Sequence, residues 1–228
     1  MTIPFREEPD GKTVNCFLDQ KLVQIKHGGE IDVCMQYPLL KMKHAIDACY
    51  VREEVRNRLY LAQSFLPDGF RIRIWDAWRP FLLQEELYNQ YSGELIKAFH
   101  ITGTEEERRR LIRRYVSEPV CDWRIPPVHT TGGAIDVTLL NADGNEIDMG
   151  TEFDSFSEKT HTDYFERGSS CEIRNNRRLL YYAMTRAGFT NLPSEWWHYD
   201  FGDRFWAYYN HTAALYCGVF TVGEKHET

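Results

Sequence analysis

The chain has 228 residues, of which 43% are hydrophobic and 14% aromatic, and its formal net charge is −7. This length and composition allow a sizeable buried core and exclude wholesale disorder. The acidic balance argues against a nucleic-acid partner, because nucleic-acid-binding proteins usually present a basic face.

Hydrophobic periodicity and turn residues predict the order of helices and strands. The expected helices cover residues 44–64, 80–99, 104–116 and 169–187. The expected strands cover residues 70–78, 134–140 and 195–201. Apolar residues recur at helical spacing in the first group, whereas Ile72 and Ile74 alternate with arginines in the first strand.

Local signals mark the ends of several of these elements. Thr104 and Glu107 form a capping box at the start of a short charged helix. Gly188 is expected just after the helix that Ser169 and Ser170 open, because a left-handed residue ends many helices. Asn141-Ala-Asp-Gly144 predicts a hairpin turn after the second strand.

This order of elements favours an α+β fold with a central, mostly antiparallel sheet flanked by helices. No internal repeat or linker-like segment stands out, so residues 1–228 are interpreted as a single domain. The aromatic segment over residues 203–220 has no clear assignment; core packing is favoured over a lid or a dimer contact. The sequence leaves the oligomeric state open.

A cytoplasmic protein with no membrane segment is expected. No stretch approaches the ~20 apolar residues of a membrane span, and the N-terminus carries acids and prolines where a signal peptide needs an apolar run. The cysteines lack a C-x-x-C pair and are interpreted as reduced, mostly buried thiols at positions 16, 34, 49, 121, 171 and 217. Cys121, close to His129 in the sequence, could instead be a metal ligand.

A histidine and an aspartate flank a Gly-Gly pair in His129-Thr-Thr-Gly-Gly-Ala-Ile-Asp136. Strand alternation places Asp136 on the face opposite the apolar residues that follow it. The glycines could fold the chain so that His129 comes beside Asp136, and both side chains are good zinc ligands. The alternative is an ordinary glycine turn with an unrelated histidine and aspartate.

The segment Glu195-Trp-Trp-His198 could supply a third ligand and a base. In a regular strand Glu195 and His198 face opposite sides, so both serve one site only if the segment bends or Glu195 lies on the preceding loop. His198 would then join His129 and Asp136 around zinc, with Glu195 as the base. Alternatively, the tryptophans are core residues and Glu195 and His198 lie at a rim.

Arg79 precedes Pro80, which favours extended backbone at the arginine. A cation at this strand end could stabilise the oxyanion of a tetrahedral intermediate. The alternative is a salt bridge at the start of a helix.

Together these clusters resemble one family, the zinc D-alanyl-D-alanine dipeptidases of the cytoplasmic, vancomycin-resistance type. Their superfamily includes D,D-carboxypeptidases and the hedgehog fold. Five stretches match in the family's order: Asp76-Ala-Trp-Arg79-Pro80 resembles D-x-Y-R-P, His129 to Asp136 resembles H-x-x-G-x-A-x-D, Met149 to Asp154 resembles M-G-T-x-F-D, Asn176-Arg-Arg178 resembles the last helix, and Glu195 to His198 matches E-W-W-H.

The resemblance implies a metallopeptidase that hydrolyses D-alanyl-D-alanine or a similar D,D-dipeptide of cell-wall origin. It implies one Zn²⁺ per chain, held by His129, Asp136 and His198, with Glu195 as general base and Arg79 as oxyanion stabiliser. It also implies that Asp154 holds the free ammonium of the small dipeptide substrate.

Some positions depart from the family pattern. Pro127 replaces a serine two residues before His129, and Thr130 and Thr131 replace the more usual Ser-Arg pair. None of these changes removes an implied zinc ligand, the base or the arginine, so they affect which peptide is expected as substrate rather than the expected reaction. The alternatives are a D,D-carboxypeptidase or a dipeptidase for another cell-wall peptide, and, from other classes, a hedgehog-like zinc protein without turnover or a metal-free binding module.

Overall fold

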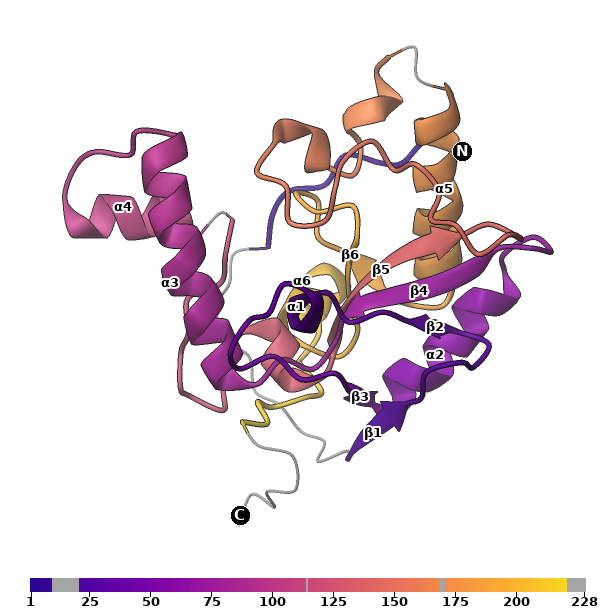
Figure 1. Cartoon of the computed structure of the whole chain (residues 1–228), viewed down its shortest axis with the longest axis horizontal. Coiled ribbons are helices and arrows are strands. Elements are labelled where there is room, and N and C mark those ends of the chain that lie inside the picture. The colour runs from indigo at the N-terminus through magenta and orange to yellow at the C-terminus, as the bar shows by residue number, and fades with distance from the viewer. Residues whose placement is uncertain (10–20, 114, 169–170, 221–228) are drawn as a thin grey trace.

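The computed structural model describes residues 1–9, 21–113, 115–168 and 171–220, and a five-stranded sheet lies at the centre of this part of the chain (Figure 1). Its strands, in spatial order, are β2 (Asp32–Val33), β4 (Arg71–Asp76), β5 (Ala134–Leu140), β7 (His198–Asp200) and β6 (Thr190–Asn191). Only β2 and β4 pair in parallel; the other neighbours are antiparallel. A separate antiparallel pair joins β1 (Leu22–Ile25) to β3 (Cys49–Arg52).

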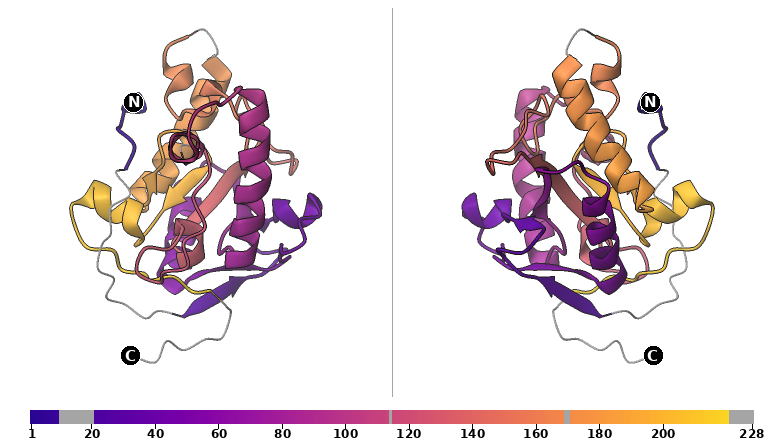
Figure 2. Two further views of the ribbon diagram at one scale, coloured as in Figure 1. Left: turned by 90° about the vertical axis from the view of Figure 1, so that its left-hand side faces the viewer. Right: turned by 90° about the vertical axis from the view of Figure 1, so that its right-hand side faces the viewer.

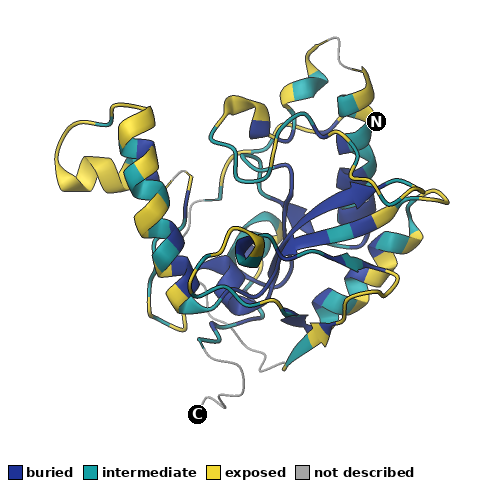
Figure 3. Ribbon diagram, in the orientation of Figure 1, coloured by how far each residue is buried: buried dark blue, intermediate teal, exposed yellow. Residues whose placement is uncertain are grey.

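Helices flank this sheet, which confirms the expected α+β class. They are α1 (Gln36–Leu39), α2 (Glu53–Ser64), α3 (Phe81–Ala98), α4 (Glu105–Ile112), α5 (Cys171–Arg186) and α6 (Arg204–Asn210), with short 3-10 helices η1 (Val128–Thr131), η2 (Glu158–Thr160) and η3 (Tyr164–Glu166). Figure 2 shows α3 and α5 on opposite sides of the molecule. Beyond α3, α4 projects outward and is largely exposed (Figure 3).

The main apolar core lies between the sheet, α2 and α5. Ile135, Val137 and Leu139 of β5 are fully buried there, together with residues such as Leu59 of α2 and Met184 of α5. Each fully buried side chain of this size contributes about 1.5–3 kcal/mol through its removal from water. The opposite face of β5 carries Ala134, Asp136 and Thr138, so this face is free to build a site.

The helix expected over residues 44–64 begins only at Glu53. Residues 49–52 form β3 instead, in which Val51 pairs with Val23 of β1 and is fully buried. The aromatic and β-branched residues at positions 50 and 51 suit a strand, and a tertiary partner decides the outcome. Glu53 and Glu54 then start α2 with favourable negative charge in its first turn.

The predicted start of α4 and the predicted glycine after α5 are confirmed. Thr104 and Glu107 form the reciprocal capping box, and α4 ends at Ile112 rather than near residue 116. Gly188 has a φ of 93° after α5, and its N–H donates to the carbonyl of Thr185 at 3.0 Å. Residues 169 and 170, expected to open this helix, lie outside the described residues.

In the C-terminal third, the expected strand is shorter than predicted and the aromatic segment contributes to the core. The strand expected over residues 195–201 begins at His198, because residues 192–195 form a turn closed by the N–H of Glu195 and the carbonyl of Leu192 at 3.1 Å. The aromatic residues 205–209 belong to α6. Tyr216 is buried in the main core and Trp206 packs against that core, as the core interpretation of this segment predicts.

The interpretation of all cysteines as reduced, mostly buried thiols is only partly confirmed. Free thiols occur at Cys34, Cys49, Cys121 and Cys171, of which only Cys49 is fully buried. Cys121 and Cys171 are exposed, and Cys217 is disulfide-bonded. Cys16 lies outside the described residues. The prediction is therefore wrong for the redox state of Cys217 and for the burial of Cys121 and Cys171.

Among the described residues, no helix combines the length and the apolar character that crossing a bilayer requires. The single-domain interpretation stays a prediction.

Candidate metal centre

Three neighbouring strands place polar side chains in one row across the sheet. Asp76 of β4 lies opposite Asp136 of β5, and Asp136 lies opposite His198 of β7. Residues that pair across antiparallel strands project from the same face of a sheet. The three side chains, all of them buried, therefore gather on the face that does not contact the main core.

A bulge at the end of β4 brings Asp76 into this row. Ile74 pairs with Val137 and faces the core, so regular alternation would send Asp76 to the core side as well. The register shifts between Ile74 and Asp76, which leaves Trp75 as an extra residue on β4. Such a bulge redirects the side chain that follows it, and here it turns Asp76 toward Asp136.

His129 reaches the same face from η1. Gly132, which ends η1, has a φ of 74°, and a Cβ at this position would approach Leu22 Cδ2 to 2.4 Å. Glycine alone adopts this conformation without strain and without a clash. The turn brings His129 Nε2 to 3.5 Å from Asp136 Oδ2, so the glycine hinge acts as expected.

The donor atoms of three residues converge at one point. His129 Nε2 lies 3.2 Å from His198 Nδ1, and His198 Nδ1 lies 3.1 Å from Asp136 Oδ1. Zinc–ligand bonds of about 2.0–2.2 Å in tetrahedral geometry separate the donor atoms by roughly 3.3–3.5 Å. These side chains therefore fit a small divalent cation, and His129, Asp136 and His198 are the described residues whose ligand atoms cluster in this way.

Each imidazole uses its second nitrogen to fix its orientation. His129 Nδ1 lies 2.9 Å from the carbonyl oxygen of Ala77, and His198 Nε2 lies 2.8 Å from Asp200 Oδ1. Because both oxygens accept hydrogen bonds, each of these nitrogens carries the N–H. In the neutral imidazoles the opposite nitrogens then direct their lone pairs toward Asp136. Metal-bound histidines are generally held in this way.

The charges around the cluster favour a bound cation. Burial, with the nearby charge of Arg79, lowers the pKa of His129 to about 3, so this imidazole is neutral. Burial also opposes a charge on His198, but the carboxylates of Asp200 and Asp136 outweigh it and raise its pKa well above the ordinary value. A divalent cation would supply the positive charge that this environment favours.

Arg79 lies beside the row, held in one orientation. Its Nη2 and Nε donate to Asp76 Oδ2 at 2.7 and 2.9 Å, and its Nη1 donates to Gln84 at 2.8 Å. Nη2 is also 3.8 Å from Asp136 Oδ2. The salt bridge at the start of a helix, weighed above as an alternative, is therefore present, and it holds the guanidinium next to the cluster.

Glu195 also faces the cluster, from the turn before β7. Its Oε2 lies 3.7 Å from His198 Nδ1, and about a quarter of its side chain is exposed. Burial raises the pKa of Glu195 to about 8, and the charge of His198 only partly offsets this rise. The condition that Glu195 lies on the preceding loop is therefore met.

Asp154 belongs to a separate but connected group. Its backbone has a φ of 54°, and its Oδ2 accepts hydrogen bonds from Tyr37 and Tyr91, each at 2.8 Å. The Tyr37 hydroxyl accepts in turn from Arg79 Nη2 at 3.1 Å. Burial, reinforced by the charge of Asp136, raises the pKa of Asp154 to about 6. Arg79 thus links the cluster to Asp154 through Tyr37.

The sequence interpretation missed several members of this network. Tyr37 lies on α1, far from the motifs, and nothing in its local sequence indicated a role. Tyr91 and Gln84 lie on α3, where their spacing reads as an ordinary helix. Asp200 had a usable signal, because residues two apart on a strand share a face and His198 was already a candidate.

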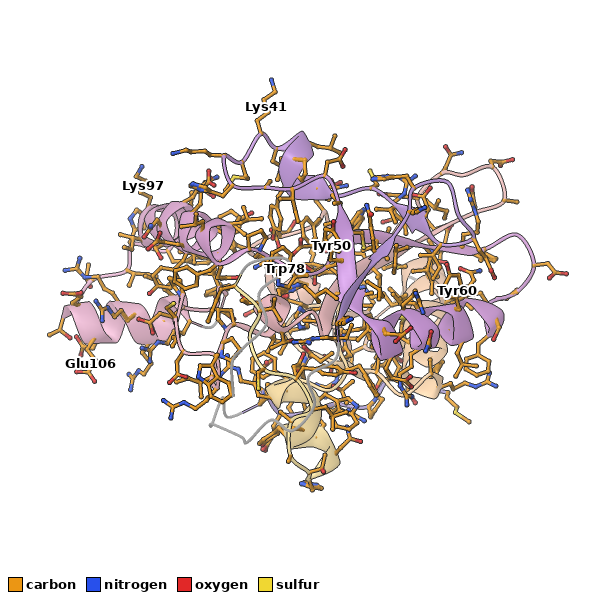
Figure 4. The ribbon with its side chains drawn as sticks, turned by 90° about the horizontal axis from the view of Figure 1, so that it is seen from below. Lys41, Tyr50, Tyr60, Trp78, Lys97 and Glu106 are labelled. Atoms are coloured by element: carbon orange, nitrogen blue, oxygen red, sulfur yellow. The ribbon has the colours of Figure 1, made fainter. Side chains whose placement is uncertain are left out.

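Among the departures from the family pattern, Thr131 has a local structural role. Thr131 Oγ1 donates to the carbonyl of Val128 at 2.6 Å and accepts from the N–H of Gly133 at 2.9 Å, which closes the η1 turn. Figure 4 shows Trp78 beside Tyr50, where the two rings meet edge to face with centroids 6.3 Å apart. Trp78 is therefore a packing residue. The exposed Cys121 is not part of the ligand cluster.

A family model and several known proteins that are similar to this chain carry the same description, D-alanyl-D-alanine dipeptidase. The model of a peptidase family, Peptidase_M15, described as D-ala-D-ala dipeptidase, matches residues 41–216. The D-alanyl-D-alanine dipeptidase of Synechocystis sp. is 31% identical over 176 residues, which cover 69% of this chain and 71% of that protein. The protein of the same name from Enterococcus faecium is 41% identical over 141 residues, which cover 59% of this chain and 64% of that protein.

Among solved structures, the chain has a more distant similarity. A variant of the vancomycin resistance D,D-pentapeptidase VanY, solved in complex with Zn(II), superposes with a TM-score of 0.46 at 14% sequence identity. The superposition covers 91% of this chain and 94% of that chain.

Proposed function

Because this chain belongs to the D-ala-D-ala dipeptidase family of peptidases, and is thus an enzyme, we propose that it hydrolyses D-alanyl-D-alanine or a similar D,D-dipeptide in a zinc-dependent reaction. The observation that carries the proposal is the convergence of three donor atoms beside an acidic side chain. His198 Nδ1 lies 3.2 Å from His129 Nε2 and 3.1 Å from Asp136 Oδ1, and His129 Nε2 lies 3.5 Å from Asp136 Oδ2. Glu195 Oε2 lies 3.7 Å from His198 Nδ1.

In this proposal His129, Asp136 and His198 hold one zinc ion per chain. Two imidazoles and a carboxylate are a common set for catalytic zinc, which keeps a further position open for water or substrate. When bound, zinc would lower the pKa of a water molecule toward about 7 and polarise the peptide carbonyl.

Glu195 acts as the general base. It takes one proton from water as the water oxygen attacks the carbonyl carbon of the peptide bond, and it returns that proton to the leaving amine nitrogen as the carbon–nitrogen bond breaks. A carboxyl group whose pKa is raised toward neutrality suits both transfers. The products are two free amino acids.

Arg79 stabilises the negative charge that develops on the carbonyl oxygen. Its guanidinium is oriented before substrate binds, because Nε and Nη2 donate hydrogen bonds to Asp76 and Nη1 donates one to Gln84. Preorganised donors of this kind stabilise a transition state more effectively than mobile ones.

Asp154 selects the substrate by binding its free ammonium group. Both tyrosine hydroxyls contact Oδ2 of Asp154, which leaves Oδ1 to pair with a cation. A longer peptide has no ammonium at this position, so its binding would leave a partly buried carboxylate unpaired at a cost of several kcal/mol. This cost favours a dipeptidase over a D,D-carboxypeptidase.

Metal analysis combined with a peptide panel tests the proposal. Purified wild type should contain about one zinc per chain and should cleave D-Ala-D-Ala, with much lower rates on L-Ala-L-Ala and on N-acetylated D-Ala-D-Ala. His198→Ala should lose both zinc and activity, whereas His100→Ala, a change at an exposed histidine, should lose neither. Preferential cleavage of the acetylated peptide would support the carboxypeptidase instead, and zinc without turnover would refute the hydrolytic role.

A further inference from the structure

Two buried carboxyl groups lie behind the candidate metal centre and take no direct part in it. Asp200 follows His198 by two residues on β7, so both side chains project from the same face. Its Oδ1 is 2.8 Å from His198 Nε2. Asp203 lies just before α6, and both aspartates are completely buried.

Only one oxygen of Asp203 has a conventional role. Its Oδ1 caps α6 by accepting from the backbone N–H groups of Phe205 at 2.9 Å and Trp206 at 3.0 Å. Among the described residues, Asp203 Oδ2 and Asp200 Oδ2 both lack a donor partner. A buried carboxylate oxygen that accepts no hydrogen bond destabilises the folded state.

These two oxygens can satisfy each other if one of them carries a proton. The carboxyl groups lie within hydrogen-bonding reach, and burial together with the charge of Asp200 raises the pKa of Asp203 well above the ordinary value. Asp203 then carries the proton and donates it to Asp200.

Asp200 and Asp203 lie close to the candidate metal centre because the chain segment around Asp203 packs closely against Gly133. A Cβ at Gly133 would lie 2.6 Å from the carbonyl oxygen of Phe201 and 3.3 Å from the Cβ of Asp203. The absence of a side chain at this position therefore lets the segment that carries Asp203 pack against the start of β5.

We propose that Asp200 is a positioning residue for His198, and that Asp203, as a neutral acid, holds Asp200 in place by donating a hydrogen bond to it. By accepting a hydrogen bond from Nε2, Asp200 selects the tautomer of His198 that presents Nδ1 to the metal, and this hydrogen bond makes Nδ1 a stronger ligand. Outer partners of this kind contribute about 10–100-fold to metal affinity. The inference rests on the proposed role of His198 as a ligand.

Zinc affinity, measured on the metal-stripped protein by competition with a chromogenic chelator, tests the pair without any assay of activity. Asp200→Asn should bind zinc about 10–100-fold more weakly than wild type. Asp203→Asn should stay within about threefold, because its amide donates to Asp200 as the acid does and its oxygen still caps α6. Asp203→Ala should lose affinity because both contacts disappear.

The control variant is Asp143→Asn, which changes an exposed carboxylate in a turn where asparagine is equally suitable. It should leave zinc affinity unchanged. Asp200→Asn with wild-type affinity would overturn the positioning role. An Asp203→Asn protein as weak as Asp203→Ala would overturn the neutral-acid role.

A spectroscopic measurement on the zinc-loaded wild type needs no variant. Heteronuclear NMR of the imidazole nitrogens should show the proton of His198 on Nε2, and a proton on Nδ1 would overturn the inference. Failure of the wild type to bind zinc would instead refute the proposed function, so the two failures are distinguishable.

Discussion

Glu195 Oε2 lies 3.7 Å from His198 Nδ1, although three residues along a regular strand would place the two side chains on opposite faces. The relationship depends on the start of β7 at His198, with Glu195 on the turn before it. The carbonyl of Glu195 accepts from the N–H of His198 at 3.2 Å, which keeps that turn closed. In the proposed function, one short motif therefore supplies both the base and a metal ligand.

Glu195→Gln should separate metal binding from catalysis. The amide keeps the size of the side chain but cannot take a proton, so D-Ala-D-Ala hydrolysis should fall by about 10²–10⁴-fold. Zinc content should stay near one per chain, because Glu195 is not among the three clustered donors. Steady-state kinetics and metal analysis on the same preparation measure the rate of hydrolysis and the zinc content. Glu152→Gln, a change at an exposed position, is the matched control, and equal activity of the two variants would refute the base.

Arg79→Lys should retain zinc and lose activity. Lysine keeps the positive charge but cannot reproduce the forked contacts with Asp76 and Gln84. We expect kcat/KM to fall by about 10²–10³-fold, the usual loss when one oxyanion donor is removed. Arg71→Lys, at an exposed position on the same strand, should leave kcat/KM unchanged. If Arg79→Lys keeps full activity, the guanidinium has only a structural role.

Asp154→Asn should change selectivity more than chemistry. Without its negative charge the site binds the ammonium of a free dipeptide less well, so KM for D-Ala-D-Ala should rise by at least about tenfold. The penalty against N-acetyl-D-Ala-D-Ala should shrink, because no carboxylate is left unpaired. The ratio of kcat/KM for the two peptides is the measurement. A ratio identical to that of wild type would show that Asp154 does not bind the free ammonium group of the dipeptide.

Gly132→Ala should destabilise the fold around His129. The φ of 74° and the 2.4 Å approach to Leu22 Cδ2 both disfavour a methyl group, and we expect a loss of at least about 1–2 kcal/mol in the free energy of unfolding. Gly93→Ala is the matched control, since that glycine lies inside α3 and a methyl group added to it would meet nothing within 4 Å. It should stabilise by about 0.5–1 kcal/mol. Urea unfolding of the metal-free proteins compares them.

Much of the site could be predicted from sequence because its residues lie in short segments with clear local signals. The alternation around Asp136 predicted its face correctly, and the capping box at Thr104 identified the start of α4. The glycine pair after His129 indicated a hinge, which the positive φ of Gly132 bears out.

The rest depends on tertiary contacts that no local pattern encodes. The bulge at Trp75 interrupts a sequence that alternates regularly, so the turn of Asp76 toward the site was not predictable. Residues 49–52 form a strand because β1 pairs with them. Tyr37 reaches Asp154 across 117 positions of the chain, and periodicity gives no information at that separation.

In the proposed function, His129, Asp136 and His198 together hold the catalytic metal. A zinc-edge anomalous difference map of crystals grown with one equivalent of zinc tests it most directly. We expect one strong peak within about 2.0–2.2 Å of His129 Nε2, His198 Nδ1 and an oxygen of Asp136. A peak held by other residues, or no peak at this position in a protein that cleaves D-Ala-D-Ala, would contradict it.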